Sequence, residues 1–189
     1  MKVFLSLKHW QLFLLIYCLP LALLAGMIGY MIIVGGGTSE ALLFYKLFLL
    51  GFLISMGIYF YWLWSLASFF TKKNPNVHRK TRLKFLLLLA FLLYVAVNLL
   101  LYLNIDTWAL EGNMQNYFKI IIIITMLGFV FVVLYLYCLY RIAKIFKTAQ
   151  LGKTASLSEF ILELLLLWFY PIGIWIIQPP VNKMLKREM

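Results

Sequence analysis

Clusters of basic residues alternate along this chain with apolar runs long enough to cross a bilayer, and this alternation limits the fold more than any other feature. Of the seventeen Lys and Arg residues, only Lys46 and Lys119 lie outside three clusters. The clusters comprise Lys2 and Lys8; Lys72, Lys73, Arg79, Lys80, Arg82 and Lys84; and Arg141, Lys144, Lys147, Lys153, Lys183, Lys186 and Arg187. Because cytoplasmic loops of membrane proteins carry an excess of Lys and Arg, the pattern predicts both membrane insertion and its orientation.

The composition excludes an ordinary soluble domain, since 65% of the residues are hydrophobic and the mean hydropathy is +0.97. We therefore predict an all-α integral membrane protein, with residues 1–189 forming a single transmembrane domain. Its predicted spans are 12–34, 41–70, 85–103 and 120–140. As a helix, the first of them would extend about 34 Å, which is enough to cross a hydrocarbon core of roughly 30 Å. Near the end of the second span, a dense group of aromatic residues predicts a belt at the membrane surface, made of Tyr59, Phe60, Tyr61, Trp62 and Trp64. The basic clusters predict a multi-pass membrane protein with both termini in the cytoplasm.

The last apolar run, within 157–177, is a poor candidate for a fifth span. It contains Glu163 and is interrupted by Pro171 and Gly173. A fifth span would also place the final basic cluster on the far side of the membrane. We predict an interfacial or re-entrant helix here, with a fifth span as the remaining alternative.

The start of this helix is predicted by a capping box, in which Ser156 is followed three residues later by Glu159. The helix should therefore begin near Leu157. It is predicted to end at Gln178, Pro179 and Pro180.

Three pairs of small residues have the spacing that allows close approach of membrane helices. They are Ala22 with Gly26, Ala25 with Gly29, and Gly51 with Ser55. Two interpretations remain open, namely an interface between copies of the chain and packing within one four-helix bundle.

Polar residues within apolar runs are the other candidates for function. Glu159 and Glu163 are one helical turn apart and could relay protons or bind a basic helix, or they could face solvent on an interfacial helix. Asn98 is the polar residue of the third span and could line a pore or bond across helices. Asn98 and Glu163, with the proline breaks at Pro20 and Pro171, would be the working parts of a small transporter or channel. Gly173, beside the second break, is a further candidate. No metal or other cofactor is predicted, because metal sites usually also recruit His or Cys.

The net charge of +11 is explained by orientation and by attraction to anionic lipid, so nucleic-acid binding is disfavoured. No Arg is followed four to six residues later by His, which excludes the simplest RNA-cleaving motif. Serine-hydrolase, phosphate-loop and zinc-protease motifs are also absent from the sequence. We therefore predict a protein that is not an enzyme. The candidate contacts to anionic lipid or to a partner are Lys72, Lys73, Arg79, Lys80, Arg82, Lys84, Arg141, Lys144 and Lys147.

Three segments carry a resemblance to known proteins. They are KHWQLFLL at 8–15, YCLYRIAKIFKTAQL at 137–151 and WFYPIGIWIIQPPVNKM at 168–184. Together they resemble a family of small uncharacterised bacterial inner-membrane proteins, with the pattern WFxPIGIWxxQPxxNKM near the C-terminus. The family usually has one proline after that glutamine, whereas here Pro179 is followed by Pro180. The resemblance implies four spans and assigns no activity or catalytic residue.

The sequence therefore predicts a membrane protein that forms homo-oligomers or docks a cytoplasmic protein. One form of this hypothesis is a defence effector that perturbs the membrane. Its architecture is also similar to that of membrane accessory proteins of CRISPR and phage-defence operons, a likeness of size, span number and charge alone. The alternatives are a small transporter or channel, and an accessory protein that binds anionic lipid or RNA.

Overall fold

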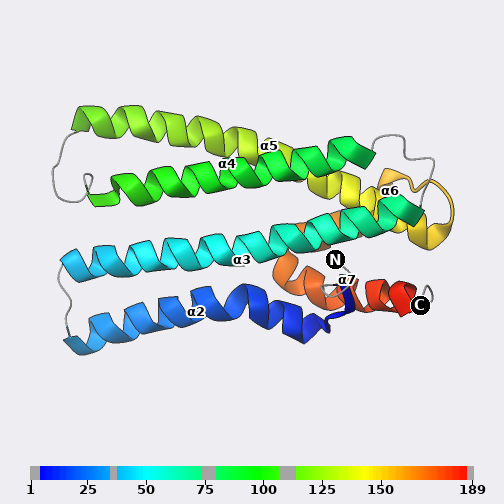
Figure 1. Ribbon diagram of the computed structural model, residues 1–189, viewed down its shortest axis with the longest axis horizontal. Helices are drawn as coiled ribbons and strands as arrows, with labels where there is room; N and C mark the ends of the chain where they lie inside the picture. The colour runs from blue at the N-terminus through cyan, green and yellow to red at the C-terminus, as the bar shows by residue number, and fades with distance from the viewer. Residues whose placement is uncertain (1–4, 35–37, 74–79, 107–113, 187–189) are drawn as a thin grey trace.

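The computed structural model describes residues 5–34, 38–73, 80–106 and 114–186, which are almost entirely helical (Figure 1). In chain order the helices are α2 (His9–Val34), α3 (Thr38–Lys73), α4 (Lys80–Asp106), α5 (Met114–Leu151), α6 (Leu157–Trp168) and α7 (Tyr170–Lys186). The helices α2, α3, α4 and α5 are long and apolar enough to cross a membrane. The prediction of an all-α membrane protein with four membrane helices is confirmed.

The four long helices lie side by side, and each connects to the next at alternate ends (Figure 1). Helix α3 packs against α2, α4 and α5, and α4 also packs against α5. We call the end where α3 and α5 finish and α4 begins the basic end, because the large basic clusters lie there. At this end α6 packs against α5, and α7 packs against α2.

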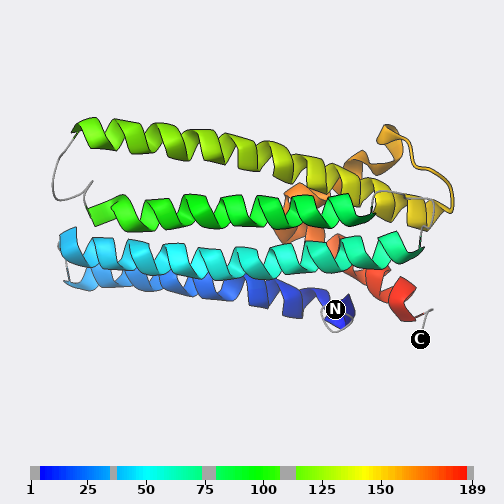
Figure 2. The ribbon, with the colours of Figure 1, turned by 45° about the horizontal axis from the view of Figure 1, so that its top comes forward.

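Helices α6 and α7, joined at Phe169, form a helical hairpin that enters and leaves the bundle at the basic end (Figure 2). Near its start, Ala155 bonds to Thr148 of α5, and near its tip Leu167 bonds to Tyr59 of α3. The returning helix ends beside the N-terminal segment, where Asn182 bonds to Leu7. The apolar run is therefore not a fifth span, and it follows the in-and-out path of a re-entrant segment.

The hairpin explains why the buried core is concentrated at the basic end. The buried apolar cluster there includes Leu12, Ile16, Tyr59, Trp62, Leu63, Leu66, Phe70, Leu83, Leu87, Cys138, Leu139, Ile142, Phe146, Phe160, Leu167, Ile174, Ile177 and Val181. In contrast, no residue of the most apolar stretch of α5 is buried. Apolar side chains gain little by leaving lipid for protein, so an open packing is tolerated within a membrane.

One detail of the sequence interpretation was wrong. The aromatic residues near the end of α3 were expected to form a belt at the membrane surface, but Tyr59, Phe60 and Trp62 are almost completely buried. The hairpin contacts Tyr59 and Trp62, and rings of α4 and α5 cover Phe60. Of the five aromatic residues, Tyr61 is exposed and Trp64 is half-buried.

The end predicted for the last helix was also wrong, because α7 continues through Pro179 and Pro180 to Lys186. A proline removes one backbone donor from a helix and thereby costs stability. Burial of Ile177, Val181 and Leu185 along one face of α7 offsets this cost and keeps the segment helical.

Candidate functional site at the basic end

The amide of Gln178 is the main polar link between the hairpin and the rest of the protein. Its Oε1 accepts a hydrogen bond of 2.9 Å from Trp62 Nε1. Its Nε2 donates to the carbonyl oxygens of Leu5 and Leu7, each at 3.0 Å, and lies 3.3 Å from Asn182 Oδ1. The side chain is fully buried, so these bonds form where water cannot replace them. One residue of α7 therefore joins α3 to the start of the chain.

Tyrosines surround the tip of the hairpin. The hydroxyl of Tyr59 donates to Leu167 O at 2.8 Å and lies 3.3 Å from the hydroxyl of Tyr135. The ring of Tyr170 stacks on Tyr17 of α2, with 5.1 Å between centroids, and also contacts the ring of Tyr59. The tip is thus held by side chains of α2, α3 and α5.

The turn of the hairpin depends on Gly173 and Pro171. The N–H of Gly173 donates to Phe169 O, which begins α7 immediately after the chain reverses. A Cβ at Gly173 would lie 1.7 Å from Leu166 O, so α6 and α7 approach too closely there for any other residue. Pro171 lies in the first turn of α7, where a missing backbone donor costs little.

Glu163 forms an ion pair with Lys147 that connects α6 to α5. The carboxylate is largely buried, and its Oε2 accepts no hydrogen bond from the part of the chain that the structure describes. Glu163 therefore faces the interior of the protein and not solvent. In this position it fixes the orientation of α6 against the basic face of α5.

We expect Lys147→Met to lower the free energy of unfolding by about 2 kcal/mol, because it leaves the buried Glu163 carboxylate unpaired. Removing one partner of a fully buried ion pair costs roughly 3–5 kcal/mol. The cost should be smaller here because 24% of the Lys147 side chain is exposed. Thermal unfolding in detergent micelles measures the change. The matched control is Lys153→Met, which should leave stability nearly unchanged because its ion pair with Glu159 is exposed to solvent. Equal effects of the two variants would contradict the buried pair.

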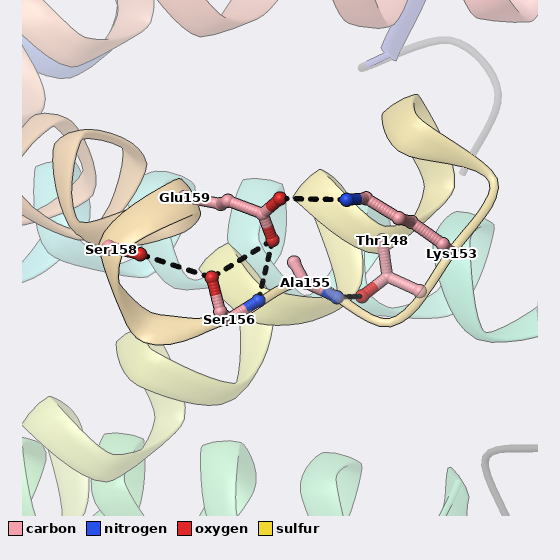
Figure 3. Close-up of polar contacts among 6 residues, drawn as sticks. All are labelled: Thr148, Lys153, Ala155, Ser156, Ser158 and Glu159. Atoms are coloured by element: carbon pink, nitrogen blue, oxygen red, sulfur yellow. Dashed lines mark hydrogen bonds and ion pairs between the residues drawn. The ribbon is translucent and has the colours of Figure 1, made fainter.

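The N-terminus of α6 is held by Glu159, as the predicted capping box requires (Figure 3). Its Oε2 accepts hydrogen bonds from the backbone N–H of Ser156 at 2.7 Å and from the Ser156 hydroxyl at 3.0 Å. Its Oε1 lies 3.1 Å from the ammonium of Lys153. The Ser156 backbone N–H, the Lys153 ammonium and the Ser156 hydroxyl all favour the ionised carboxylate and lower the pKa of Glu159 below its ordinary value of 4.5. This residue caps the hairpin and is not directed into the protein.

This cap predicts a pH dependence of stability. Because the folded-state pKa of Glu159 is lowered, the unfolded state binds its proton more readily, and the stabilisation present above pH 4.5 is lost as the pH falls further. We expect Glu159→Gln to flatten the decrease in melting temperature below pH 4.5, measured by circular dichroism in detergent. A decrease as steep as that of the unsubstituted chain would show that the cap makes no contribution.

The remaining polar candidate, Asn98, lies apart from the hairpin. Its Nδ2 donates to Tyr94 O, one turn earlier in the same helix, at 2.9 Å. Its hydrogen bond is therefore local to α4, whereas Glu163 pairs with α5. The structure does not bring these two candidates for a transport site together.

The three small-residue pairs divide into two kinds. Gly51 is buried, and a Cβ there would lie 2.5 Å from Leu23 Cδ1, so this position packs α3 against α2 within one chain. The hydroxyl of its partner Ser55 donates to Gly51 O. In contrast, nothing lies within 4 Å of a Cβ built at Gly26 or Gly29. The side of α2 that carries these two glycines, with the exposed Ala22 and Ala25, is not used for packing within the described chain.

The basic candidates gather around the open end of the hairpin. Arg141, Lys144 and Lys147 follow one another along α5, while Arg82 and Lys84 lie at the start of α4. The ammonium group of Lys84 lies 5.8 Å from the ring centroid of Trp64. Arg79 lies outside the described residues, as do the side chains of Lys72, Lys73 and Lys80.

Sequence reasoning missed the most connected polar residue. Gln178 was assigned to the end of a helix, although it is the one amide between Ile174 and Val181, both buried on the same helix face. A polar side chain at an apolar helical position is a usable signal for a buried hydrogen bond. Its partners, Trp62 and Leu5, are too distant in sequence to be identified from spacing.

Among the described residues, no group of three or more His, Cys, Asp and Glu side chains could hold a metal ion. Comparisons with protein-family models, with curated proteins and with solved structures find no match to this chain. The arrangement of the basic end is therefore the basis on which a function can be proposed.

Proposed function

We propose that this polytopic membrane protein is a non-enzymatic docking protein, which binds an acidic surface of a cytoplasmic protein at its basic end. The observation that carries the proposal is the unbalanced positive charge at this end. Among the side chains described there, Glu159 and Glu163 are the acidic ones, and both are paired with lysines. The basic side chains without a described ion pair are Lys8, Arg82, Lys84, Arg141, Lys144, Lys183 and Lys186.

The hairpin supports this proposal because it holds the charges in place. Lys183 and Lys186 are exposed on α7, whose opposite face is buried through Val181 and Leu185. Arg141 and Lys144 lie on a part of α5 that is anchored by the buried residues Ile142 and Phe146. A partner would therefore contact charged side chains on ordered helices. Preorganised charges lose less conformational entropy on binding than charges on a flexible tail.

The proposal also requires that the basic end lies on the cytoplasmic side of the membrane. The positive-inside rule favours placing it in the cytoplasm, with both termini there, in a bacterial inner membrane. A transporter is less well supported, because Asn98 bonds within its own helix while Glu163 pairs with Lys147.

A second candidate role, homo-oligomer formation, is favoured by the open face of α2. Close approach of membrane helices needs small residues, and among the described residues nothing lies within 4 Å of a Cβ built at Gly26 or Gly29. Oligomers that open under a trigger would give a membrane-perturbing defence effector. A strict monomer in detergent, together with no dye leakage from cells that overexpress the protein, would exclude this role.

The docking proposal is tested with the full chain in nanodiscs of uncharged phosphatidylcholine and a fluorescent poly-glutamate peptide as the probe. We expect Lys183→Gln with Lys186→Gln to weaken binding severalfold, since each charge near the contact contributes. Lys119→Gln with Lys46→Gln, which removes two charges from the other end, is the matched control. Binding that is unchanged by the first pair, or reduced equally by both pairs, would overturn the proposal.

A further inference from the structure

We infer that a notch between α4 and α5 at the basic end is a binding site for the phosphate group of an anionic membrane lipid. The notch is a cavity of about 70 Å³ lined by Arg82, Leu83, Leu86, Tyr137 and Arg141. We call it the arginine notch. Lipid binding in the arginine notch does not require a protein partner at the same end of the molecule.

Two arginines from different helices line this notch. Arg141 Nη1 donates to the hydroxyl of Tyr137 at 3.2 Å, and its guanidinium lies 6.0 Å from the centroid of the same ring. Neither Arg82 nor Arg141 forms an ion pair with a carboxylate in the described part of the chain. Guanidinium groups match the geometry of phosphate oxygens and form charge-assisted hydrogen bonds with them.

The depth of the notch corresponds to the headgroup region. From Arg82 to Asn104, at the other end of its span, the rise of α4 is about 33 Å, and from Phe118 to Arg141 the rise of α5 is about 34 Å. Both distances slightly exceed a hydrocarbon thickness of roughly 30 Å. If the opposite ends of these spans lie at one membrane surface, both arginines lie at the other, at the level of lipid phosphates.

The surroundings of the notch favour a lipid over a free phosphate ion. Leu83 and Leu86 form an apolar wall, and an exposed apolar strip extends from the notch along α5 through Tyr137, Val133 and Val130. An acyl chain can follow this strip towards the middle of the membrane while its phosphate remains between the guanidinium groups. A soluble anion would gain nothing from that strip.

The test uses the purified full chain in phosphatidylcholine nanodiscs with increasing fractions of phosphatidylglycerol, and it measures bound lipid by native mass spectrometry. We expect Arg82→Gln with Arg141→Gln to weaken retention of phosphatidylglycerol by at least about tenfold, because the variant loses charge-assisted hydrogen bonds from two guanidinium groups to one phosphate. Lys183→Gln with Lys186→Gln removes the same charge from the same end and should change retention less than about threefold.

Three results would overturn the inference. The first is an equal loss in the arginine and lysine variants, which would indicate attraction by general charge. The second is displacement of the lipid by millimolar inorganic phosphate, which would indicate a site for a soluble anion. The third is unchanged retention in Arg82→Gln alone; Arg82 is exposed, so this variant remains informative even if the double variant does not fold. Tyr137→Phe, which removes the hydrogen bond to Arg141, should give an intermediate loss.

Discussion

Replacing Gly173 by alanine is expected to open the hairpin and to lower the free energy of unfolding by about 3 kcal/mol or more. The added methyl group would lie 1.7 Å from the carbonyl oxygen of Leu166, which is backbone and cannot rotate away. Either α6 or α7 must shift, and a shift disturbs the buried cluster that the hairpin completes. Thermal unfolding in detergent measures the loss.

The control for this variant is Gly128→Ala on α5, where nothing lies within 4 Å of the added Cβ. An alanine in an open helical position should leave stability unchanged or raise it by up to about 1 kcal/mol.

Labelling of Cys138 provides a second measurement, because this thiol is fully buried in the folded protein. Cys18 is exposed and is therefore replaced by serine in all variants. We expect faster maleimide labelling of Cys138 in Gly173→Ala than in Gly128→Ala. Equal labelling and equal stability would contradict the required close approach.

The second large effect is expected for Gln178→Leu, which should cost about 3 kcal/mol. Leucine fills a similar volume but leaves the buried Trp62 N–H without its acceptor and Leu5 O without its donor. Each buried polar group that loses its partner costs about 1–3 kcal/mol. Chemical unfolding in mixed micelles gives the change. The matched control, Gln150→Leu, alters an exposed glutamine of α5 and should change stability by less than about 0.5 kcal/mol.

A double-mutant cycle isolates the contact itself. Trp62→Phe removes the indole donor, so Gln178→Leu should cost less in that background than in the unsubstituted chain. We expect a coupling of about 1 kcal/mol between the two positions. Additive effects would mean that the amide acts through its contacts to Leu5 and Leu7 and not through Trp62.

The long helices could be predicted from the sequence because the membrane imposes a simple rule. A backbone in lipid must satisfy its own hydrogen bonds, so long apolar runs become helices whatever surrounds them. The runs at 12–34 and 85–103 accordingly lie within α2 and α4. The start of α6 was also predictable, because the Ser156 and Glu159 bonds that define it are local in sequence.

The path of the hairpin was only partly predictable. Pro171 and Gly173 indicated an interruption, and the basic cluster after it indicated a return to the same side. The position of the tip, however, depends on contacts such as Tyr59 with Leu167, which are 108 residues apart. For the same reason the rings at the end of α3 were wrongly assigned to the membrane surface, since nothing near them in sequence indicates that the hairpin covers them.

Within the candidate site, the residue types were predictable but their pairing was not. Glu163 and Lys147 were both candidates, one as an acid that could relay protons, bind a basic helix or face solvent, and the other as a contact to anionic lipid or a partner. Their ion pair requires α6 to lie against α5, which follows from packing and not from spacing. The notch formed by Arg82 and Arg141 was likewise hidden within a longer set of basic residues, because the two belong to different helices.

The concentration of the buried core at one end has a consequence for the order of assembly. Ribosomes make α2 to α5 before α6 and α7, so all four spans can enter the membrane while the core that joins them is still incomplete. Until α6 and α7 have been made, Tyr59 lacks the carbonyl of Leu167 and Trp62 lacks the amide oxygen of Gln178. The four spans can therefore enter the membrane before their tertiary structure is complete, and the docking of α7 beside α2 completes the buried core.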